Sequence, residues 1–363
     1  MSEAEIAPRD FSELQHVLAE TPRVLPIGSR TKRPLCHAED ATAVSIRHLR
    51  GIIEYEPSEF TFTAWAGTPL SEIVQTLRNR RQYLPFDPPL VDAGATLGGT
   101  VASGLSGPGR FRFGGVRDFV IGVKLLAGDG QLVQGGGKVV KNAAGFDLPK
   151  FLVGSLGRYG LMTELSFKVF PQPPATRTLT VACGSHREAI ECIFAVASSR
   201  WEADALDYRP AQKTVAIRLA GPEKSNDQIA GEILSTWPGG ERLDSGEADQ
   251  DWRSVTDLSW SGMPDWLVAK VPTTAKRFLD LQTVLEGREG VSVHLSVAGG
   301  VTWIALDDLA SLQWLDGQLT SQQLAGLVVR GDCHSPRVGS WPENEMQRAV
   351  KRAMDPHSKF AGI

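Results

Sequence analysis

Glycine is concentrated in one segment of this chain. Of the 37 glycines among 363 residues, 18 lie between Asp92 and Gly160. Glycine is costly in entropy to order and adds no side chain to a core, so packing alone does not account for such a segment. Its usual purpose is the close approach of backbone amides to an anionic ligand, above all a phosphate at a helix N-terminus. Tight turns among short strands are the alternative, and they explain most single glycines.

The composition is that of a globular protein, with 42% hydrophobic and 22% charged residues. The net charge of -4 repels a phosphate backbone, so nucleic acid is not an expected partner. No apolar stretch reaches the ~18 residues of a membrane span, and the start of the chain lacks the layout of a signal peptide. The four scattered cysteines form no metal or disulfide spacing. We therefore expect a cytoplasmic protein with reduced thiols and no metal site.

The chain is expected to divide at the proline-rich stretch 170–174, because proline disfavours both helix and interior strand. The length corresponds to about two domains, and eight of the nine tryptophans follow residue 200. We predict one domain over 1–172, a second over 175–335, and a C-terminal helix and tail over 336–363 that return toward the first domain.

Several elements of the first domain follow from local patterns. The runs 52–55 and 61–66 are rich in β-branched and aromatic residues and predict an antiparallel pair of strands. Thr68 is expected to cap the next helix. The sequence at 128–130, Gly-Asp-Gly, predicts a β-hairpin. Within the glycine-rich segment, Thr96 is expected to cap a short helix whose first amides point outward.

The second half alternates strands and helices in the order strand, helix, strand, strand, helix, strand. Its segments 179–236 and 266–330 predict an antiparallel sheet covered on one side by helices, which makes the fold class α+β. Trp252 and Trp260 lie in a polar stretch without clear periodicity. We interpret both as candidates for a partner surface, since tryptophan is enriched at interfaces.

The common phosphate-binding motifs are absent. The glycine pairs 107–109 and 128–130 have G-x-G spacing but lack the third glycine that a dinucleotide fingerprint requires three residues later. A P-loop needs Ser or Thr where Val139 stands. An NAD-binding Rossmann domain and an ATPase are therefore not predicted. Two loops remain, 28–32 and 95–104, and together they suit a pyrophosphate.

Six blocks of sequence resemble the FAD-binding domain of the vanillyl-alcohol oxidase and p-cresol methylhydroxylase (PCMH) superfamily. These blocks are Pro26–Lys32, Asp87–Pro89, Ala95–Gly99, Val116–Gly122, Lys141–Leu148 and Gly154–Gly157. Within the superfamily the chain is most similar to the FAD-binding subunits, or E subunits, of glycolate oxidases. The resemblance implies a PCMH-type FAD-binding domain of two α/β subdomains, followed by a cap domain with an antiparallel sheet.

The resemblance also implies which residues bind FAD, with the pyrophosphate held between the two loops. Covalent attachment needs a His or Tyr at defined loop positions, and none of the blocks presents one, so noncovalent FAD is expected. The implied cofactor-binding residues are Ile27, Gly28, Ser29, Arg30, Thr31, Lys32, Pro88, Thr96, Gly98, Gly99, Ser103, Gly104, Gly160 and Leu161.

Two positions depart from the family pattern. Arg30 stands where the first loop usually has glycine, so either the loop geometry differs or the guanidinium adds a phosphate contact. After Phe360 the family commonly has Asn-Pro-Gly-Arg, which Ala-Gly-Ile replaces here.

The function implied is that of an FAD-binding subunit of a glycolate oxidase complex, which oxidises glycolate to glyoxylate beside a homologous catalytic flavoprotein and an iron-sulfur subunit. Through this complex the protein could be peripheral to the inner membrane. A self-sufficient FAD-dependent 2-hydroxy-acid dehydrogenase and a noncatalytic scaffold that has lost flavin are the alternatives. Oxidation of a 2-hydroxy acid needs a proton acceptor and a cation for the carboxylate. The candidates are His334, Arg330 and Arg337, although a lone loop histidine is more often structural.

Overall fold

A computed structural model describes residues 5–36, 38, 40–137, 146–342 and 345–362. The predicted block Lys141–Leu148 therefore lies largely outside the described residues. The chain forms two compact units, the first from 1–106, 115–172 and 343–363 and the second from 107–114 and 173–342. Part of the glycine-rich segment, 107–114, thus belongs to the second unit, where Phe111 packs against the core.

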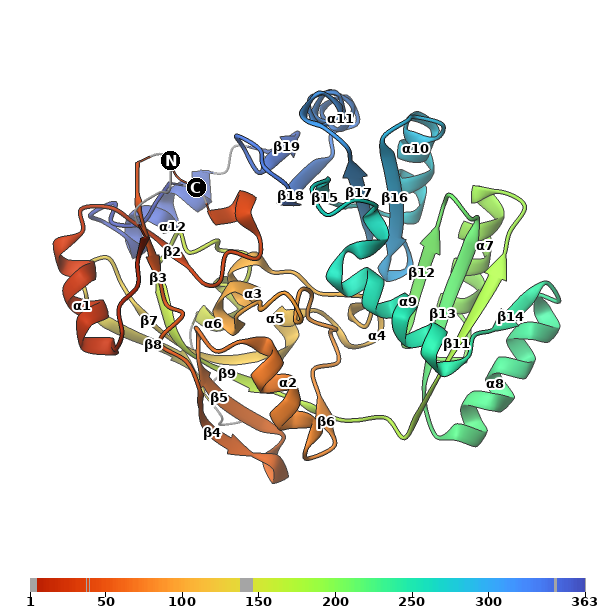
Figure 1. Cartoon of the computed structure of the whole chain (residues 1–363), viewed down its shortest axis with the longest axis horizontal. Helices are drawn as coiled ribbons and strands as arrows, with labels where there is room; N and C mark the ends of the chain where they lie inside the picture. The colour runs from red at the N-terminus through yellow and green to blue at the C-terminus, as the bar shows by residue number, and fades with distance from the viewer. Residues whose placement is uncertain (1–4, 37, 39, 138–145, 343–344, 363) are drawn as a thin grey trace. The chain divides into compact units, whose positions relative to one another are not determined.

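The first unit contains two sheets, a three-stranded parallel sheet in the order β1-β3-β2 and a five-stranded antiparallel sheet in the order β4-β5-β9-β7-β8 (Figure 1). Their strands are β1 (Glu5–Ile6), β2 (Val24–Ile27), β3 (Thr42–Ser45), β4 (Ile52–Glu56), β5 (Thr61–Trp65), β7 (Val120–Leu126), β8 (Leu132–Gly136) and β9 (Leu161–Lys168). A further short pair joins β6 (Gln82–Tyr83) to β10 (Phe170–Pro171). The predicted strand pair and the predicted hairpin, now β4 with β5 and β7 with β8, are confirmed.

The helices of the first unit are short. They are α1 (Phe11–Glu20), α2 (Leu70–Arg78), α3 (Leu97–Ser103), α5 (Val116–Phe119), α6 (Leu148–Phe151) and α12 (Glu345–Met354), with 3-10 turns η1 (Arg33–Cys36) and η2 (Pro57–Glu59). The prediction that Thr68 caps α2 is wrong. Its hydroxyl donates to the Trp65 carbonyl at 2.6 Å, and Pro69 occupies the capping position.

Buried aromatic rings fill the core beneath the antiparallel sheet of the first unit. The rings of Phe62 and Phe167 stack with centroids 5.7 Å apart, and those of Phe86 and Phe119 lie 5.4 Å apart. The C-terminal tail also belongs to this unit. Phe360 is fully buried and pairs with Val24, so the tail runs alongside β2.

The second unit is built on one nine-stranded antiparallel sheet in the order β14-β11-β13-β12-β16-β17-β15-β18-β19. Its strands are β11 (Ala175–Ala182), β12 (Ala205–Arg209), β13 (Thr214–Gly221), β14 (Gly240–Arg242), β15 (Leu267–Pro272), β16 (Val291–Ser296), β17 (Val301–Leu306), β18 (Ala325–Arg330) and β19 (Arg337–Gly339). Its helices are α4 (Arg110–Phe113), α7 (His186–Ala197), α8 (Glu223–Thr236), α9 (Ser245–Asp257), α10 (Ala275–Leu285) and α11 (Leu309–Ser321), with η3 (Ser259–Ser261) and η4 (Val297–Gly299).

Apolar side chains on one face of this sheet pack against α7, α8, α10 and α11. The predicted α+β fold class, with an antiparallel sheet covered by helices, is confirmed. Pairing of β12 with β16 joins the two halves of the predicted pattern into one continuous sheet.

The interpretation of Trp252 as a partner-surface residue is wrong. Trp252 lies on α9, is 7% exposed, and its indole N–H donates to Thr178 Oγ1 at 2.9 Å. Only two side chains of α9 are buried, so its polar sequence has little apolar periodicity. For this reason the sequence did not predict the buried side of this helix. Trp260 is half-buried, and its ring lies 5.3 Å from that of His294.

Candidate functional site

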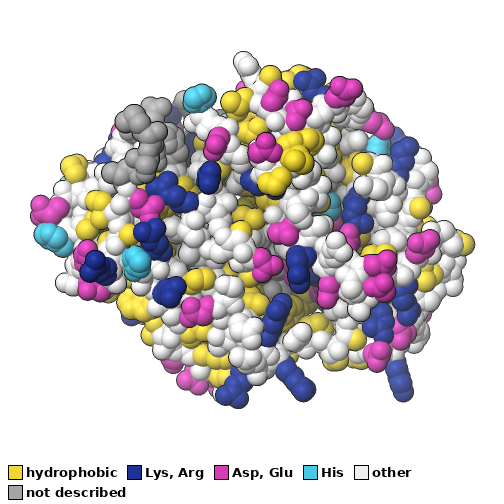
Figure 2. Space-filling model, viewed as in Figure 1, with side chains coloured by type: hydrophobic (Ala, Val, Ile, Leu, Met, Phe, Trp, Pro, Cys, Tyr) yellow, Lys and Arg dark blue, Asp and Glu magenta, His cyan; other side chains and the backbone are white. Residues whose placement is uncertain are grey.

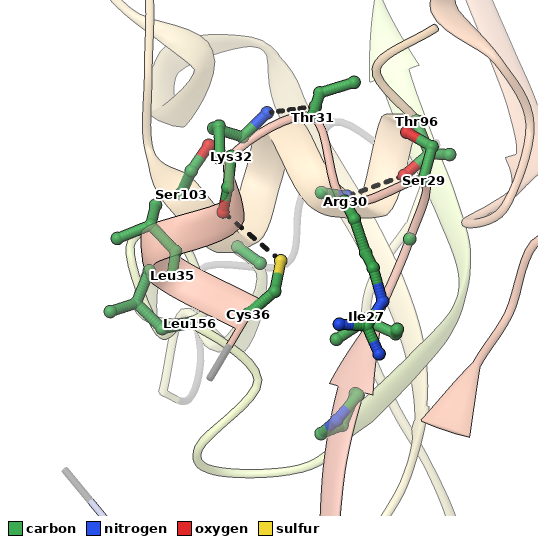
Figure 3. A pocket seen from close by; sticks show the side chains of 14 residues that line it. Ile27, Ser29, Arg30, Thr31, Lys32, Leu35, Cys36, Thr96, Ser103 and Leu156 are labelled. Atoms are coloured by element: carbon green, nitrogen blue, oxygen red, sulfur yellow. Dashed lines mark hydrogen bonds between the residues drawn. The ribbon is translucent and has the colours of Figure 1, made fainter. Parts of the chain in front are cut away.

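The loop after β2 and helix α3 line a small, open pocket in the first unit (Figure 3). The pocket brings the predicted residues Ile27–Lys32 together with Thr96, Gly99 and Ser103. The remaining lining residues are Pro26, Leu35, Cys36, Ala102 and Leu156. The two loops that the sequence singled out therefore meet at one place.

Gly28 is needed at the end of β2 because a side chain there has no room. A Cβ atom on Gly28 would lie 2.3 Å from Thr96 Oγ1, far inside van der Waals contact. Two residues later, Arg30 has a φ of 57°, the left-handed conformation that glycine adopts most easily. Arg30 therefore has a backbone conformation that suits glycine, and its Nε donates to Glu5 Oε2 at 2.9 Å.

Helix α3 is capped as predicted, since Thr96 Oγ1 accepts from the Gly99 amide at 3.2 Å. The expectation that the first amides of this helix point outward is wrong. The Leu97 amide donates to Thr68 O at 2.9 Å, and the Gly98 amide donates to Ala66 O at 2.7 Å. The start of the helix is buried against the turn before α2, and buried amides require acceptors. These three N–H groups are therefore already paired within the protein.

The amides available to a ligand belong instead to the first loop. Within the described ranges, the backbone N–H groups of Ser29, Thr31 and Lys32 have no protein acceptor. Ser29 Oγ donates to Gly94 O at 2.6 Å, which helps to hold the loop in place. Successive unpaired amides in a turn form a concave donor surface that suits an anion.

Lys32 brings a buried positive charge to the same pocket. Lys32 is 6% exposed, and burial lowers the pKa of its ammonium group to about 8. In the part of the chain that the structure describes, its one hydrogen-bond partner is Thr31 Oγ1, at 3.3 Å. Burial raises the pKa of the neighbouring Cys36 thiol, so Cys36 is neutral and supplies no counter-charge. A buried cation in this state calls for an anionic ligand.

Five of the predicted cofactor residues do not line the pocket: Pro88, Gly98, Gly104, Gly160 and Leu161. Packing explains two of these glycines. A Cβ on Gly160 would lie 2.2 Å from Leu125 Cδ1, and Gly104 ends α3 with a φ of 64°. A cofactor contact for any of the five stays a prediction.

The three candidate catalytic residues lie in the second unit. Arg330 donates from Nε to Trp266 O at 3.2 Å and from an Nη to Leu258 O at 2.9 Å, so it holds the segment after α9. Arg337 lies over the ring of Trp341 at 5.0 Å, and His334 is exposed. These contacts give Arg330 a structural role, and catalysis by the three residues stays a prediction.

Two features of the second unit were missed at the level of sequence. Asp207 and His294 are fully buried, with His294 Nε2 2.8 Å from Asp207 Oδ2, and Ser296 donates to Oδ1 at 2.8 Å. Lys270 lies within the apolar strand Leu-Val-Ala-Lys-Val-Pro of β15. A charged residue in the middle of an apolar strand is the signal that could have singled out Lys270.

Comparison with known proteins identifies this fold. Residues 2–136 match the family model described as FAD binding domain. The solved structure of p-cresol methylhydroxylase with substrate bound superposes with a TM-score of 0.73 over 98% of this chain and 88% of that one, at 14% identity. An alkyldihydroxyacetonephosphate synthase gives a TM-score of 0.69 over 98% and 76%, at 16% identity. The structural likeness confirms the PCMH-type fold.

The chain therefore contains an FAD-binding domain over residues 2–136. It is similar to the glycolate oxidase subunit GlcE of Escherichia coli, with 43% identity over 67% of this chain and 66% of that subunit. It is also similar to the glycolate oxidase subunit GlcD of Bacillus subtilis, with 29% identity over 49% and 39%. The matches thus span just under two thirds of the first relative and less than half of the second.

A third relative covers more of the chain. A D-2-hydroxyglutarate dehydrogenase of Xanthomonas citri is 22% identical over 96% of this chain and 86% of its own length. The family resemblance inferred from the six sequence blocks is confirmed by these matches.

Within the described residues, every helix is too short or too polar to cross a membrane. Figure 2 shows basic and acidic side chains scattered together over the visible face.

Proposed function

We propose that this chain is the FAD-binding subunit of a glycolate oxidase complex and takes part in oxidising glycolate to glyoxylate. Its 43% identity to a subunit of that name supports the proposal. The observation that carries it is the pocket of the first unit, where the buried Lys32 lies beside backbone amides and, among the described residues, neither the ammonium group has a counter-charge nor the amides an acceptor. The proposed partners are a homologous catalytic flavoprotein and an iron-sulfur subunit.

FAD fits the donors of this pocket. Ser29, Thr31 and Lys32 would bind its pyrophosphate through their backbone amides, and the Lys32 ammonium group would neutralise part of its charge. Gly28 lets the first loop pack closely against Thr96 at the start of α3. When bound, FAD supplies the acceptor for the two electrons removed from the alcohol carbon. The described lining of the pocket contains neither His nor Tyr, which supports noncovalent binding.

A self-sufficient 2-hydroxy-acid dehydrogenase is the second candidate. It is favoured by the match to D-2-hydroxyglutarate dehydrogenase, which runs through both units of this chain. Steady-state oxidation of glycolate and of D-2-hydroxyglutarate by the FAD-loaded chain alone, with a dye as acceptor, separates the two candidates. Turnover that requires partner subunits supports the complex, and robust turnover by the chain alone supports the dehydrogenase.

The binding of FAD is tested through Lys32. The purified chain should be yellow and should release FAD on acid precipitation. Lys32→Met keeps most of the aliphatic stem and removes the charge. A hydrogen bond to a charged group contributes about 1.5–3 kcal/mol, so the dissociation constant of FAD should rise roughly 10- to 100-fold.

Lys276→Met, at an exposed lysine of α10, is the matched control and should bind FAD like the parent. Fluorescence titration of flavin-stripped protein with FAD measures all three affinities, and circular dichroism checks that each variant is folded. A folded parent that neither contains nor binds FAD would support the scaffold alternative. Unchanged affinity in Lys32→Met would contradict the placement of the pyrophosphate.

A further inference from the structure

The nine-stranded sheet of the second unit has two unlike faces. Side chains alternate between the faces of a strand. In β15, Leu267, Ala269 and Val271 belong to the core under the helices, so Lys270 points to the opposite face. Directly opposite Lys270 stand Trp303 in β17 and Leu327 in β18. The ammonium group thus emerges between a buried indole and an aliphatic side chain.

Lys270 has no counter-charge. It is partly buried, and in the portion of the chain that the structure describes it has neither a hydrogen bond nor an ion pair. Burial lowers the pKa of its ammonium group to about 8, and the positive charge of Arg110 lowers it further. The charged group that shifts the pKa of Lys270 is therefore itself a cation, Arg110. Proteins ordinarily pair a buried charge with one of opposite sign.

Two described carboxylates on this side of the sheet already have partners. Asp207 accepts hydrogen bonds from Ser296 and pairs with His294. The Asp251 carboxylate is paired with Arg209. Along the row that crosses the strands through Lys270, the residues are Arg209, His294, Trp303, Lys270, Leu327 and Arg337. The described row continues from Arg209 to Thr214 and Ala182, and no acidic residue occurs in it.

Arg110 is held in place by its neighbours on α4. Phe111 packs into the core of the second unit. Arg112 donates to the Glu202 carbonyl at 2.5 Å and to Glu202 Oε2 at 2.7 Å. The segment 107–114 is therefore fixed to the second unit, and within the described residues the Arg110 guanidinium itself has no acceptor.

We infer that Lys270 and Arg110 bind the carboxylate of a small 2-hydroxy acid. The inference rests on the proposed function, because it assigns a residue pair to the substrate of that reaction. A carboxylate would receive one ammonium and one guanidinium group from different segments of the same unit. The apolar side chains of Trp303 and Leu327 limit hydration of the ammonium group, which strengthens its attraction to an anion.

The first test measures the protonation of Lys270 directly. The full chain is labelled at its lysines by reductive ¹³C-methylation, and the pKa of each is followed by NMR with and without glycolate. A bound carboxylate stabilises the ammonium form, so glycolate should raise the pKa of Lys270 by at least one unit. Exposed Lys276 should not change. Each unit corresponds to tenfold tighter binding of glycolate to the protonated form.

Variants test the same site by calorimetric titration with glycolate. Lys270→Met should weaken binding at least tenfold, Lys270→Arg should stay within a few-fold of the parent, and Arg110→Gln should lie between them. Lys276→Met is the control and should bind like the parent. Sodium sulfate is titrated as a second probe, and weaker binding of sulfate than of glycolate is expected.

Three results would overturn the inference: an unmoved pKa of Lys270, undiminished glycolate binding by Lys270→Met, or a response to sulfate equal to that to glycolate. FAD content is measured separately in every variant and should equal that of the parent. A chain that binds FAD but does not use Lys270 for glycolate overturns only the inference. A chain without FAD overturns the proposed function, while the titration of Lys270, which needs no flavin, still decides the inference.

Discussion

The contact between Gly28 and Thr96 joins the two loops of the pocket, and it makes a sharp test of how they are packed. In Gly28→Ala, the new Cβ would be placed 2.3 Å from Thr96 Oγ1, whereas ordinary contacts begin near 3.4 Å. The overlap of about 1 Å must be relieved by moving the loop or the cap of α3. Overpacking of this kind costs about 1–3 kcal/mol, and loss of the cap adds about 1 kcal/mol. Gly28→Ala should therefore lower the free energy of unfolding by roughly 2–4 kcal/mol.

Removal of the Thr96 hydroxyl should rescue much of this loss. Thr96→Ala alone removes the cap and costs about 1 kcal/mol. In the double variant the offending oxygen is gone, and the nearest remaining Thr96 atom, Cβ, would lie at 3.4 Å. The double variant should therefore be more stable than Gly28→Ala alone, with a coupling energy of about 1–3 kcal/mol.

Urea unfolding of the flavin-free protein, followed by circular dichroism, measures the four stabilities of this cycle. Hydrogen exchange of the peptides that cover 24–32 and 96–104 localises the effect to the two loops. If the two substitutions are additive, Gly28 and Thr96 do not touch as described, and the reasoning fails. Thr96→Ser is a further control, because it keeps the hydroxyl and should not rescue Gly28→Ala.

Two further predictions concern buried charge in the second unit. Asp207→Ala should destabilise the protein by about 3–5 kcal/mol, since it strands a buried histidine, a buried serine hydroxyl and the Val297 amide. Asp227→Ala, at a surface carboxylate paired with Arg177 and Arg242, should cost much less in the same urea titration. Lys270→Met should stabilise the ligand-free protein at pH 7 by an amount on the order of 1–3 kcal/mol, because the folded state lowers the pKa of this lysine to about 8. The unfolded chain binds the proton of the Lys270 ammonium group more tightly than the folded chain does. The resulting loss of folding free energy in the parent is therefore complete below pH 8 and decreases as the pH rises toward 10.5. Thermal unfolding of parent and variant from pH 7 to 10 should show the difference shrinking, and a constant difference would contradict the assigned cause.

The elements that local sequence predicts well are those whose signals are contiguous. The hairpin at 128–130, the cap at Thr96 and the strands of the second half each depend on residues within a few positions of one another. The six sequence blocks likewise identified the FAD-binding family. The buried side of helix α9 has no contiguous sequence signal, and it was therefore not predicted. Only contacts with distant residues, such as Thr178, show that Trp252 is buried.

The pairing of amides was decided by tertiary structure. By sequence, the backbone N–H groups of the two loops, 28–32 and 95–104, are equally available. In the structure, however, the amides of Leu97 and Gly98 donate to carbonyls some thirty residues away, at Thr68 and Ala66. Those of Ser29, Thr31 and Lys32 are left for a ligand. A backbone donor is available only where no carbonyl packs against it, and that depends on which segments meet in space.

The sequence by itself determined the resemblance to an FAD-binding domain, carried by six contiguous blocks, and it predicted an antiparallel sheet after that domain, because contiguous blocks and strand periodicity are local properties. Only the tertiary structure decided which charges are left without partners. Lys32 and Lys270 are ordinary lysines in the sequence, and each becomes a candidate ligand-binding group because folding buries it away from every described carboxylate. Burial and charge pairing depend on contacts between distant segments, and for this reason they cannot be predicted from local pattern.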